Sequence, residues 1–247
     1  MSYDCFSAYY DLLTDNVEYE KRAEYFCKLI ATAGQEKGIL LDLACGTGSL
    51  SVEFAKRGFE VIGVDISPQM LTVAREKAYE QGADVLLLCQ PMQELDLYGT
   101  VDAAVCALDS INHLESAEDV KETFRKVSLF MNPGGVFVFD VNTIYKHACI
   151  LGDNAFVFDC EDLFCTWQNS FDPADNSVQV DLDFFEDDGS GAYIRTSESF
   201  VETAFELDEI SNWLCQAGFE VLGVYDDLST LPVNETSERA VFLARKK

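Results

Sequence analysis

The sequence predicts an α/β fold, in which a small antiparallel β unit is inserted into a chain that forms a seven-stranded, mostly parallel sheet. Between Gly38 and Val141, short apolar runs alternate with amphipathic stretches. Strands that are apolar on both faces and separated by helices indicate a parallel sheet covered on both sides. After about residue 150 the pattern changes to longer segments with period-two alternation, and the α/β pattern returns from Leu207 onwards.

The first half of the chain is expected to supply five strands and most of the helices. The strands are the apolar runs 39–41, 61–64, 85–88, 101–108 and 136–139. The helices are the amphipathic segments 17–33, 47–57, 68–81 and 117–130. The boundaries of the third helix are the clearest, because Ser67 can cap its N-terminus, Pro68 fits its first turn and Gly82 follows its end.

The second half is expected to contain the insertion and the end of the main domain. Strands with alternating patterning are predicted at 156–171, 177–185 and 192–205, joined by turn-rich segments, which indicates two or three antiparallel strands. The helix 207–217 and the strands 219–225 and 239–244 then complete the sheet. We expect residues 1–150 and 202–247 to form the main domain and residues 151–201 to form the insertion.

Composition restricts the functional classes. With 17 Lys and Arg against 44 Asp and Glu, the formal net charge is −27, which argues against binding to nucleic acid or anionic membranes but tolerates a cationic ligand. No secretory signal and no transmembrane stretch is predicted. The 9 cysteines occur singly and form no Cys-x-x-Cys pair, so neither a disulfide framework nor a metal site is expected. We therefore expect a cytoplasmic monomer or homodimer.

A nucleotide-type ligand is predicted at the carboxyl ends of the first two strands. Gly46 and Gly48 follow the first strand and allow a sharp turn with close approach of a ligand. Asp65 ends the second strand, where a carboxylate can accept hydrogen bonds from both hydroxyls of a ribose.

Two classes of ligand fit this arrangement. A dinucleotide favours Gly-x-Gly-x-x-Gly, but the third position here is Ser51, and residues 38–55 contain no Lys or Arg to offset a pyrophosphate. A helix N-terminus alone can bind phosphate, so a dinucleotide is disfavoured and not excluded. S-adenosylmethionine has adenosine without phosphate and carries two cationic groups, which suits Asp42 beside the glycine loop.

Beyond this point the sequence resembles a known family. The segment LDLACGTGSLSVEFAKRGFEVIGVDISPQMLTVAREKA, residues 41–78, resembles motifs I to II of the class I methyltransferases. The resemblance continues in CALDSINHL, NPGGVFVFDVNT and the closing GFEVLGVYDD and SERAVFLARK. The start, YDCFSAYYDLLTDNVEY, is similar to the YqeM-like methyltransferases of bacteria. The resemblance implies a Rossmann-like sheet with a reversed C-terminal β-hairpin, and S-adenosylmethionine as cofactor.

The resemblance also implies roles for individual residues. Those implied to contact the cofactor are Tyr10, Asp42, Ala44, Cys45, Gly46, Gly48, Asp65, Ile66, Met70, Met92 and Asp109. Tyr3 and Asn112 are expected near the acceptor, with Tyr3 and Tyr10 closing over the pocket. Two positions depart from the family pattern. Ala44 replaces a frequent glycine, and Pro91 replaces an Asp that accepts a hydrogen bond from the adenine amino group.

The candidates for catalysis lie after the fourth strand. Asp109 would lie near the transferred methyl group, and His113 could act as a general base because imidazole titrates near neutral pH. Asp109 could instead be a turn former, and His113 could instead be a histidine that is hydrogen-bonded within its loop. Methyl transfer requires chiefly alignment of the acceptor and exclusion of water, so no catalytic triad is expected.

The acceptor is expected to be a small molecule, because the aromatic-rich insertion would roof the acceptor pocket. Three alternatives remain at this stage. The chain could methylate RNA or protein, it could be a nicotinamide-dependent oxidoreductase, or it could bind S-adenosylmethionine without catalysis.

Overall fold

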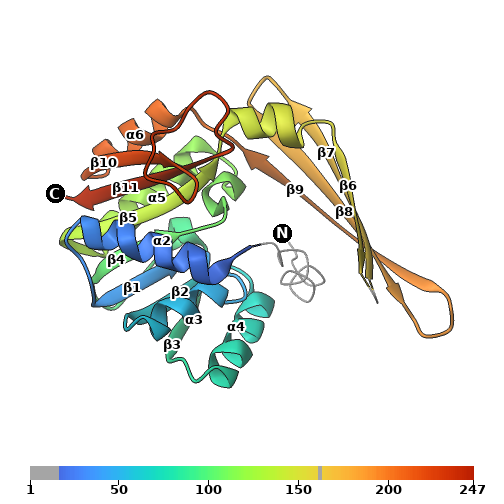
Figure 1. The fold of residues 1–247 in the computed structure, drawn as a ribbon, viewed down its shortest axis with the longest axis horizontal. Coiled ribbons are helices and arrows are strands. Elements are labelled where there is room, and N and C mark those ends of the chain that lie inside the picture. Colours follow the sequence, from blue (N-terminus) through green and yellow to red (C-terminus); the bar gives the residue numbers. More distant parts are fainter. Residues whose placement is uncertain (1–16, 161–162) are drawn as a thin grey trace.

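The computed structural model describes residues 17–160 and 163–247, which contain two β-sheets (Figure 1). The larger sheet has seven strands in the order β10-β11-β5-β4-β1-β2-β3. Its strands are β1 (Ile39–Leu43), β2 (Glu60–Asp65), β3 (Val85–Cys89), β4 (Val101–Cys106), β5 (Met131–Asn142), β10 (Phe219–Asp226) and β11 (Arg239–Lys246). Only β11 runs antiparallel to its neighbours, β5 and β10. The expected mostly parallel sheet with a reversed C-terminal hairpin is therefore confirmed.

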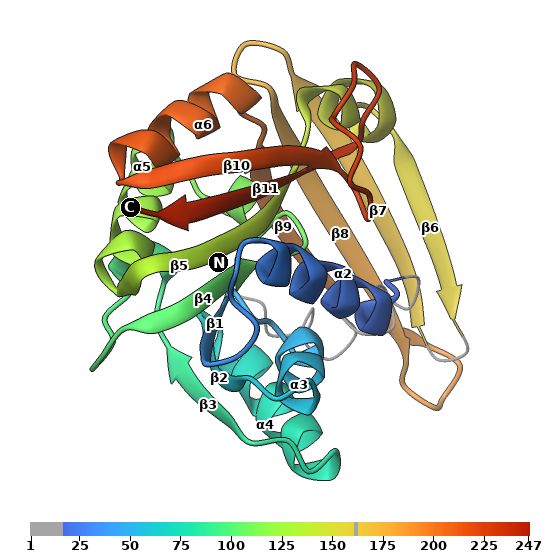
Figure 2. The same cartoon turned by 60° about the vertical axis from the view of Figure 1, so that its left-hand side comes forward.

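Helices cover both faces of the larger sheet (Figure 2). One face buries apolar side chains against α2 (Tyr19–Thr32) and α3 (Ser49–Lys56), including Phe26 and Phe54. The other face packs against α5 (Ala117–Leu129) and α6 (Leu207–Gln216), around the rings of Phe137, Phe139 and Phe124. The long β5 supplies side chains to both clusters, as its two-sided apolar sequence predicts.

Local sequence signals fix the helix that follows β2. The helix α4 (Pro68–Glu80) begins where expected, because the Ser67 hydroxyl accepts a hydrogen bond from the Met70 N–H at 3.2 Å and proline occupies the first turn. A similar cap starts α5, where Ser116 accepts from the Asp119 N–H at 3.2 Å. These caps hold the start of each helix beside the carboxyl edge of the sheet.

The β3 edge differs from the sequence expectation. Its run of apolar residues predicted burial on both faces, but Leu86 is 57% exposed. The connection from β3 to β4 carries only the short 3-10 helix η1 (Met92–Glu94), so no long helix of the described chain covers this side of the edge strand.

The insertion is a four-stranded antiparallel sheet in the order β6-β7-β8-β9. It projects to one side of the larger sheet, as Figure 1 shows on the right. Its strands are β6 (Ala155–Cys160), β7 (Leu163–Asp172), β8 (Ser177–Asp187) and β9 (Tyr193–Thr203), preceded by the π-helix η3 (Lys146–Leu151). The expectation of two or three strands is wrong by at least one, because the segment 156–171, predicted as a single strand, spans the antiparallel pair β6 and β7.

No described helix is long and apolar enough to cross a membrane.

One glycine of the first loop is required by packing as well as by its backbone angle. Gly48 has φ +76°, and a Cβ there would lie 2.8 Å from Ala74 Cβ in α4. Gly48→Ala should cost about 1–2 kcal/mol for the left-handed backbone and about 1–3 kcal/mol for overpacking. Gly58→Ala is the matched control, because Gly58 has φ +91° and open space around its Cβ position. Urea unfolding should show a larger loss for Gly48→Ala, and equal losses would contradict this account.

Candidate active site

The loop after β1 turns through a series of left-handed residues at the carboxyl edge of the sheet. Ala44 has φ 57°, Gly46 has φ 54° and Gly48 has φ 76°. The Ala44 side chain is therefore tolerated at a position that favours glycine, at a cost of about 1 kcal/mol. A Cβ on Gly46 would meet no protein atom within 4 Å, so this backbone faces open space.

Asp65, at the end of β2, fastens this loop. Its Oδ2 accepts the Gly46 N–H at 2.8 Å, and its Oδ1 accepts the Ser67 N–H at 2.8 Å. The residue is 8% exposed, and burial raises the pKa of the carboxyl although both N–H donors oppose that rise. Each oxygen retains lone-pair capacity for a further donor, which two adjacent hydroxyls can supply.

Asp65 lies in a cavity of about 310 Å³, a size within the range of about 300–1,000 Å³ found for small-molecule sites. Three apolar residues implied to contact the cofactor, Ile66, Met70 and Met92, also line it. The remaining lining residues are Ala44, Gly46, Val64, Gln90, Pro91, Gln93, Leu108, Ser110, His113, Leu114, Glu115 and Asp119. The cavity combines these apolar residues with three carboxylates, Asp65, Glu115 and Asp119.

A smaller cavity of about 30 Å³ adjoins it and shares Ala44, Gly46, Leu108 and Ser110. Asp42 lines this cavity and is 1% exposed. Burial raises the pKa of its carboxyl to about 7, although a hydrogen bond from the Ser51 hydroxyl opposes the shift. A cationic group bound here would favour the ionised form of Asp42.

Cys45 lines the smaller cavity, but its sulfur points towards the sheet. A Cβ added to Gly63 in β2 would lie 3.0 Å from Cys45 Sγ. Burial raises the pKa of this thiol well above its usual value, so it is an unreactive packing group.

Pro91 lines the larger cavity and offers no side-chain acceptor there. Two neighbouring glutamines also line it. The Gln90 amide is already bonded to the backbone of Asp96, at 2.9 and 3.1 Å. Gln93, two residues after Pro91, is the second polar side chain close to the missing acceptor, and a motif comparison at position 91 alone does not identify it.

The loop after β4 is held by the fully buried Asp140. Leu108 and Asp109 are both left-handed, with φ 57° and 53°, and their N–H groups donate to Asp140 at 3.1 and 2.7 Å. The guanidinium of Arg239 bonds both Asp140 and Asp109, and Arg22 lies 3.5 Å from Asp140. Consecutive left-handed non-glycine residues are costly, and these contacts offset the strain.

Asp109 belongs to this network and lines neither cavity. Arg239 lies 2.5 Å from its Oδ1, and although burial acts in the opposite direction, this cation lowers the pKa of Asp109 below its usual range. Burial acts to lower the pKa of Arg239, but the carboxylates of Asp109 and Asp140 outweigh it and raise that pKa. Sequence patterns could not have found Arg239 or Arg22, because their partners are distant in the chain. Asp140 could have been noticed in the sequence, because it is an acidic residue directly after the apolar run 136–139.

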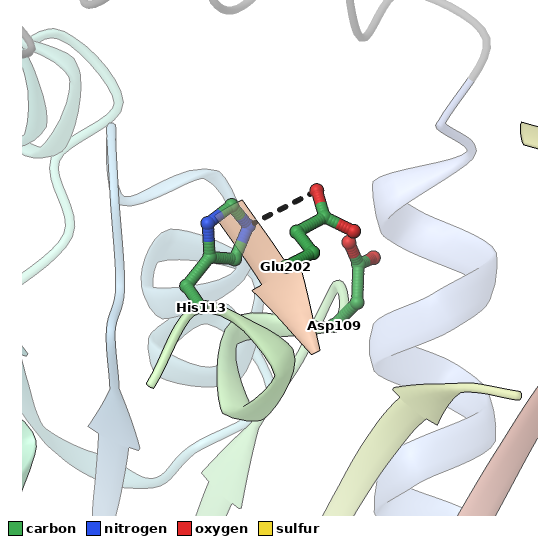
Figure 3. Close-up of side chains that lie close together, drawn as sticks. All are labelled: Asp109, His113 and Glu202. Atoms are coloured by element: carbon green, nitrogen blue, oxygen red, sulfur yellow. Dashed lines mark ion pairs between the residues drawn. The ribbon is translucent and has the colours of Figure 1, made fainter. Parts of the chain in front are cut away.

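Three titratable side chains converge beside the larger cavity (Figure 3). Ligand atoms of Asp109, His113 and Glu202 all lie within 4.8 Å of one another. Glu202 comes from β9 of the insertion, and His113 Nε2 lies 3.6 Å from its Oε1. These atom types can bind a cation, but Arg239 already occupies Asp109. We therefore do not infer a metal site from this cluster.

Two further residues expected in the site, Asn112 and Gly48, line neither cavity. Asn112 is fully buried, and its amide bonds Asn142 and the Thr203 carbonyl, which joins the 3-10 helix η2 (Ser110–His113) to β5 and β9. Its hydrogen-bonding groups are used internally, so we do not retain it as an acceptor contact. Gly48 acts through packing. Tyr3 and Tyr10 lie outside the described residues.

Known proteins resemble the chain over its whole length. The sequence model of a family described as “Methyltransferase domain” matches residues 40–135. A methyltransferase-family protein of Geobacillus sp. (strain WCH70) is 33% identical over 247 residues, covering 100% of both chains. The methyltransferase-family protein YqeM of Bacillus subtilis (strain 168) is 36% identical over 247 residues, covering 100% of this chain and 98% of that protein.

A solved structure and two partial relatives add to this comparison. An S-adenosylmethionine-dependent methyltransferase from Clostridium acetobutylicum superposes with a TM-score of 0.88 at 32% identity, over 97% of this chain and 96% of that chain. A glycine/sarcosine N-methyltransferase of Halorhodospira halochloris is 29% identical over 53% of this chain and 50% of its own length. A ubiquinone biosynthesis O-methyltransferase of Xanthomonas axonopodis is 31% identical over 46% of each.

The cavities fit the cofactor that these comparisons indicate. A cavity that combines apolar residues with a carboxylate suits adenosine, and the adjoining acidic cavity without Lys or Arg suits a cationic amino-acid tail. The lining of the two cavities gives no such support to the alternative ligand, a dinucleotide. The full-length similarity and the cavities together show that the chain belongs to the YqeM-like family of class I methyltransferases, enzymes that use S-adenosylmethionine.

Proposed function

We propose that the enzyme transfers the methyl group to a small molecule held between the loop after β4 and the insertion. The observation that supports this most directly is the contact of β9 with the loop that carries His113. The Phe200 and His113 rings are 5.1 Å apart, and the Thr203 carbonyl accepts from Asn112 at 2.9 Å. An insertion strand packed on this loop limits the room for a macromolecule.

Charge and relatives support the same conclusion. With a formal net charge of −27, the chain is poorly suited to RNA, which requires a basic surface. Relatives that match about half of the chain are named for methylation of glycine and sarcosine and for ubiquinone biosynthesis. Both N and O atoms are acceptors in such reactions, and we propose a small molecule without choosing between them.

Individual residues would divide the work of binding. Asp65 would accept hydrogen bonds from the ribose hydroxyls, and Asp42 would pair with the ammonium group. Ile66, Met70 and Met92 would pack on the adenine. The Gln93 amide oxygen would replace the acceptor that Pro91 cannot provide, a bond worth about 0.5–1.5 kcal/mol.

The bound cofactor supplies a methyl group that is already activated by the positive charge on sulfur. The protein must then align the acceptor atom and exclude water. His113 lines the larger cavity and packs on Phe200 of the insertion, and it could take up a proton that leaves the acceptor. Asp109 would act through its ion pair with Arg239, as a group that positions the loop.

This proposal is tested by incubating the enzyme with S-adenosylmethionine labelled in the methyl group and three separated fractions from a bacterial lysate: metabolites, RNA and protein. We expect label in the metabolite fraction, identified by mass spectrometry. Label confined to RNA or protein would contradict the proposal. Binding of S-adenosylhomocysteine without labelling of any fraction would support a non-catalytic binding module instead.

The carboxylate of Asp42 should lower the stability of the folded protein and raise its affinity for the cofactor. Its pKa is raised from 3.8 to about 7 in the folded protein, so the folded state binds the proton more tightly than the unfolded chain. Stability contributed by this group is therefore present at low pH and is lost as pH rises from about 4 to about 7. Above pH 7 the penalty is about 4 kcal/mol, from about 1.4 kcal/mol per pKa unit.

Asp42→Asn removes that penalty and also removes the charge that would bind the ammonium. We expect the variant to unfold at a higher temperature than wild type at pH 8.5, to keep about half of this advantage at pH 5.5 and to lose most of it near pH 4. Its affinity for S-adenosylhomocysteine at pH 8.5 should fall about tenfold or more, as expected for a charged hydrogen bond worth about 1.5–3 kcal/mol. Asp84→Asn, at an exposed position, is the charge-matched control and should change neither quantity. Equal affinity of Asp42→Asn and wild type would contradict the role of Asp42.

A further inference from the structure

The chain has two histidines, and both face the same buried carboxylate. Glu202 has a side chain that is 5% exposed, and it lies between them. His113 Nε2 is 3.6 Å from Glu202 Oε1, and His147 Nε2 is 3.6 Å from Glu202 Oε2. Figure 3 shows the first of these contacts, with the imidazole and the carboxylate pointing towards each other.

The hydrogen bonds of His147 determine where its protons lie. Its Nδ1 is 3.0 Å from the backbone carbonyl of Asn176, and a carbonyl can only accept, so Nδ1 carries a hydrogen. A neutral ring would then present the bare Nε2 lone pair to a Glu202 oxygen. Nε2 is buried and has no hydrogen-bond partner within the described chain, so no other group relieves that repulsion. A proton between Nε2 and Oε2 turns the repulsion into an ion pair.

The surroundings of Glu202 also require a compensating charge. Among the described residues, the Asn142 amide donates a hydrogen bond to it at 3.3 Å, and a buried carboxylate with so little support is costly. The nearby Asp109 and Arg239 pair with each other. Lys146 bonds the Asn142 side chain at 2.9 Å, and burial lowers the pKa of its ammonium although nearby carboxylates, Glu202 among them, oppose that shift. His147 is therefore the partner best placed to balance Glu202.

We propose that Glu202 and His147 form a buried ion pair, and that this pair keeps His113 neutral with its hydrogen on Nε2, facing Glu202. Without His147, the buried carboxylate would draw a second proton onto His113. Nδ1 of His113, which has no hydrogen-bond partner within the described chain, is then left unprotonated. Glu202 and His147 are positioning residues in this scheme.

The consequence for catalysis rests on the proposed function. Nδ1 of the neutral His113 is buried in the described structure, so it would take up a proton from the acceptor only where binding of the acceptor brings the two into contact. Glu202 would then stabilise the imidazolium that forms, before the proton passes to solvent. The arrangement of the three side chains does not depend on the identity of the acceptor. It can therefore be tested without one.

The test is nitrogen NMR of the full-length protein labelled with ring-¹⁵N histidine, at pH 7.5 and without acceptor. Two histidines give two ring spin systems, and ring nitrogen shifts distinguish protonated from unprotonated positions. We expect His147 to be protonated on both nitrogens and His113 on Nε2 alone. A singly protonated His147, or a doubly protonated His113, would overturn the proposal.

Variants test the coupling between the three residues. In Glu202→Gln, which keeps the shape but removes the charge, His147 should lose its Nε2 proton. In His147→Gln, which keeps an N–H donor but cannot carry charge, His113 should become doubly protonated. The double variant should return His113 to the neutral form, a rescue that a purely structural effect would not give.

Glu198→Gln is the control, because Glu198 lies on the same face of β9 as Glu202 and carries the same charge. It should leave both histidine spectra unchanged. Unchanged histidine protonation in Glu202→Gln, or in His147→Gln, would overturn the proposal, and if one of these variants fails to fold the other still decides. Failure to find an acceptor would affect only the proposed function, since these spectra require none.

Discussion

The cofactor site depends on one carboxylate that fastens two chain segments to the end of a strand. Asp65 accepts the Gly46 N–H with one oxygen and the Ser67 N–H with the other, both at 2.8 Å. The glycine loop and the start of α4 are thus held at the place where β1 and β2 lie side by side. Burial makes the negative charge of Asp65 costly, so the ionised carboxylate is favoured only where further hydrogen-bond donors reach it. Ribose hydroxyls are such donors, so the same contact that shapes the loop prepares it for a nucleoside.

The same device recurs along the carboxyl edge of the sheet. Asp140, on β5, accepts two consecutive N–H groups and a hydrogen bond from Arg239, with the Arg22 guanidinium 3.5 Å away, and so holds the strained loop that leads to His113. Arg22 comes from α2 and Arg239 from the start of β11, so residues near both ends of the chain stabilise the centre of the site. The two cavities themselves are lined by Asp65, Glu115, Asp119 and Asp42, with no Lys or Arg among their described lining residues, which is consistent with a cofactor that carries positive charge and no phosphate.

The sequence predicted those features that depend on neighbouring residues. Ser67 and Pro68 mark the start of α4, and Gly46, Gly48 and Asp65 mark the ligand loop, because each requirement is local to a turn or a strand end. The fourth strand of the insertion was missed because Glu161 and Asp162, the residues between β6 and β7, include no glycine or proline to mark a break in the strand. Glu202 and Arg239 were missed because their roles come from contacts with residues far away in sequence, and a charged residue in a strand gives no sign of its partner. Asn112 was expected to face the acceptor, yet folding uses its amide to join β5 and β9.

The central claim is that a phosphate-free nucleoside is held by Asp65, and calorimetric titration of the Asp65→Ala variant with S-adenosylhomocysteine tests it most directly. Loss of a carboxylate that accepts hydrogen bonds costs about 1.5–3 kcal/mol, which is about tenfold or more in affinity. Glu60→Ala, at the exposed start of the same strand, should bind as wild type does. Weakened binding in the Asp65 variant alone is the predicted result. Undiminished affinity in that variant, or no binding by the wild-type protein, would contradict the account.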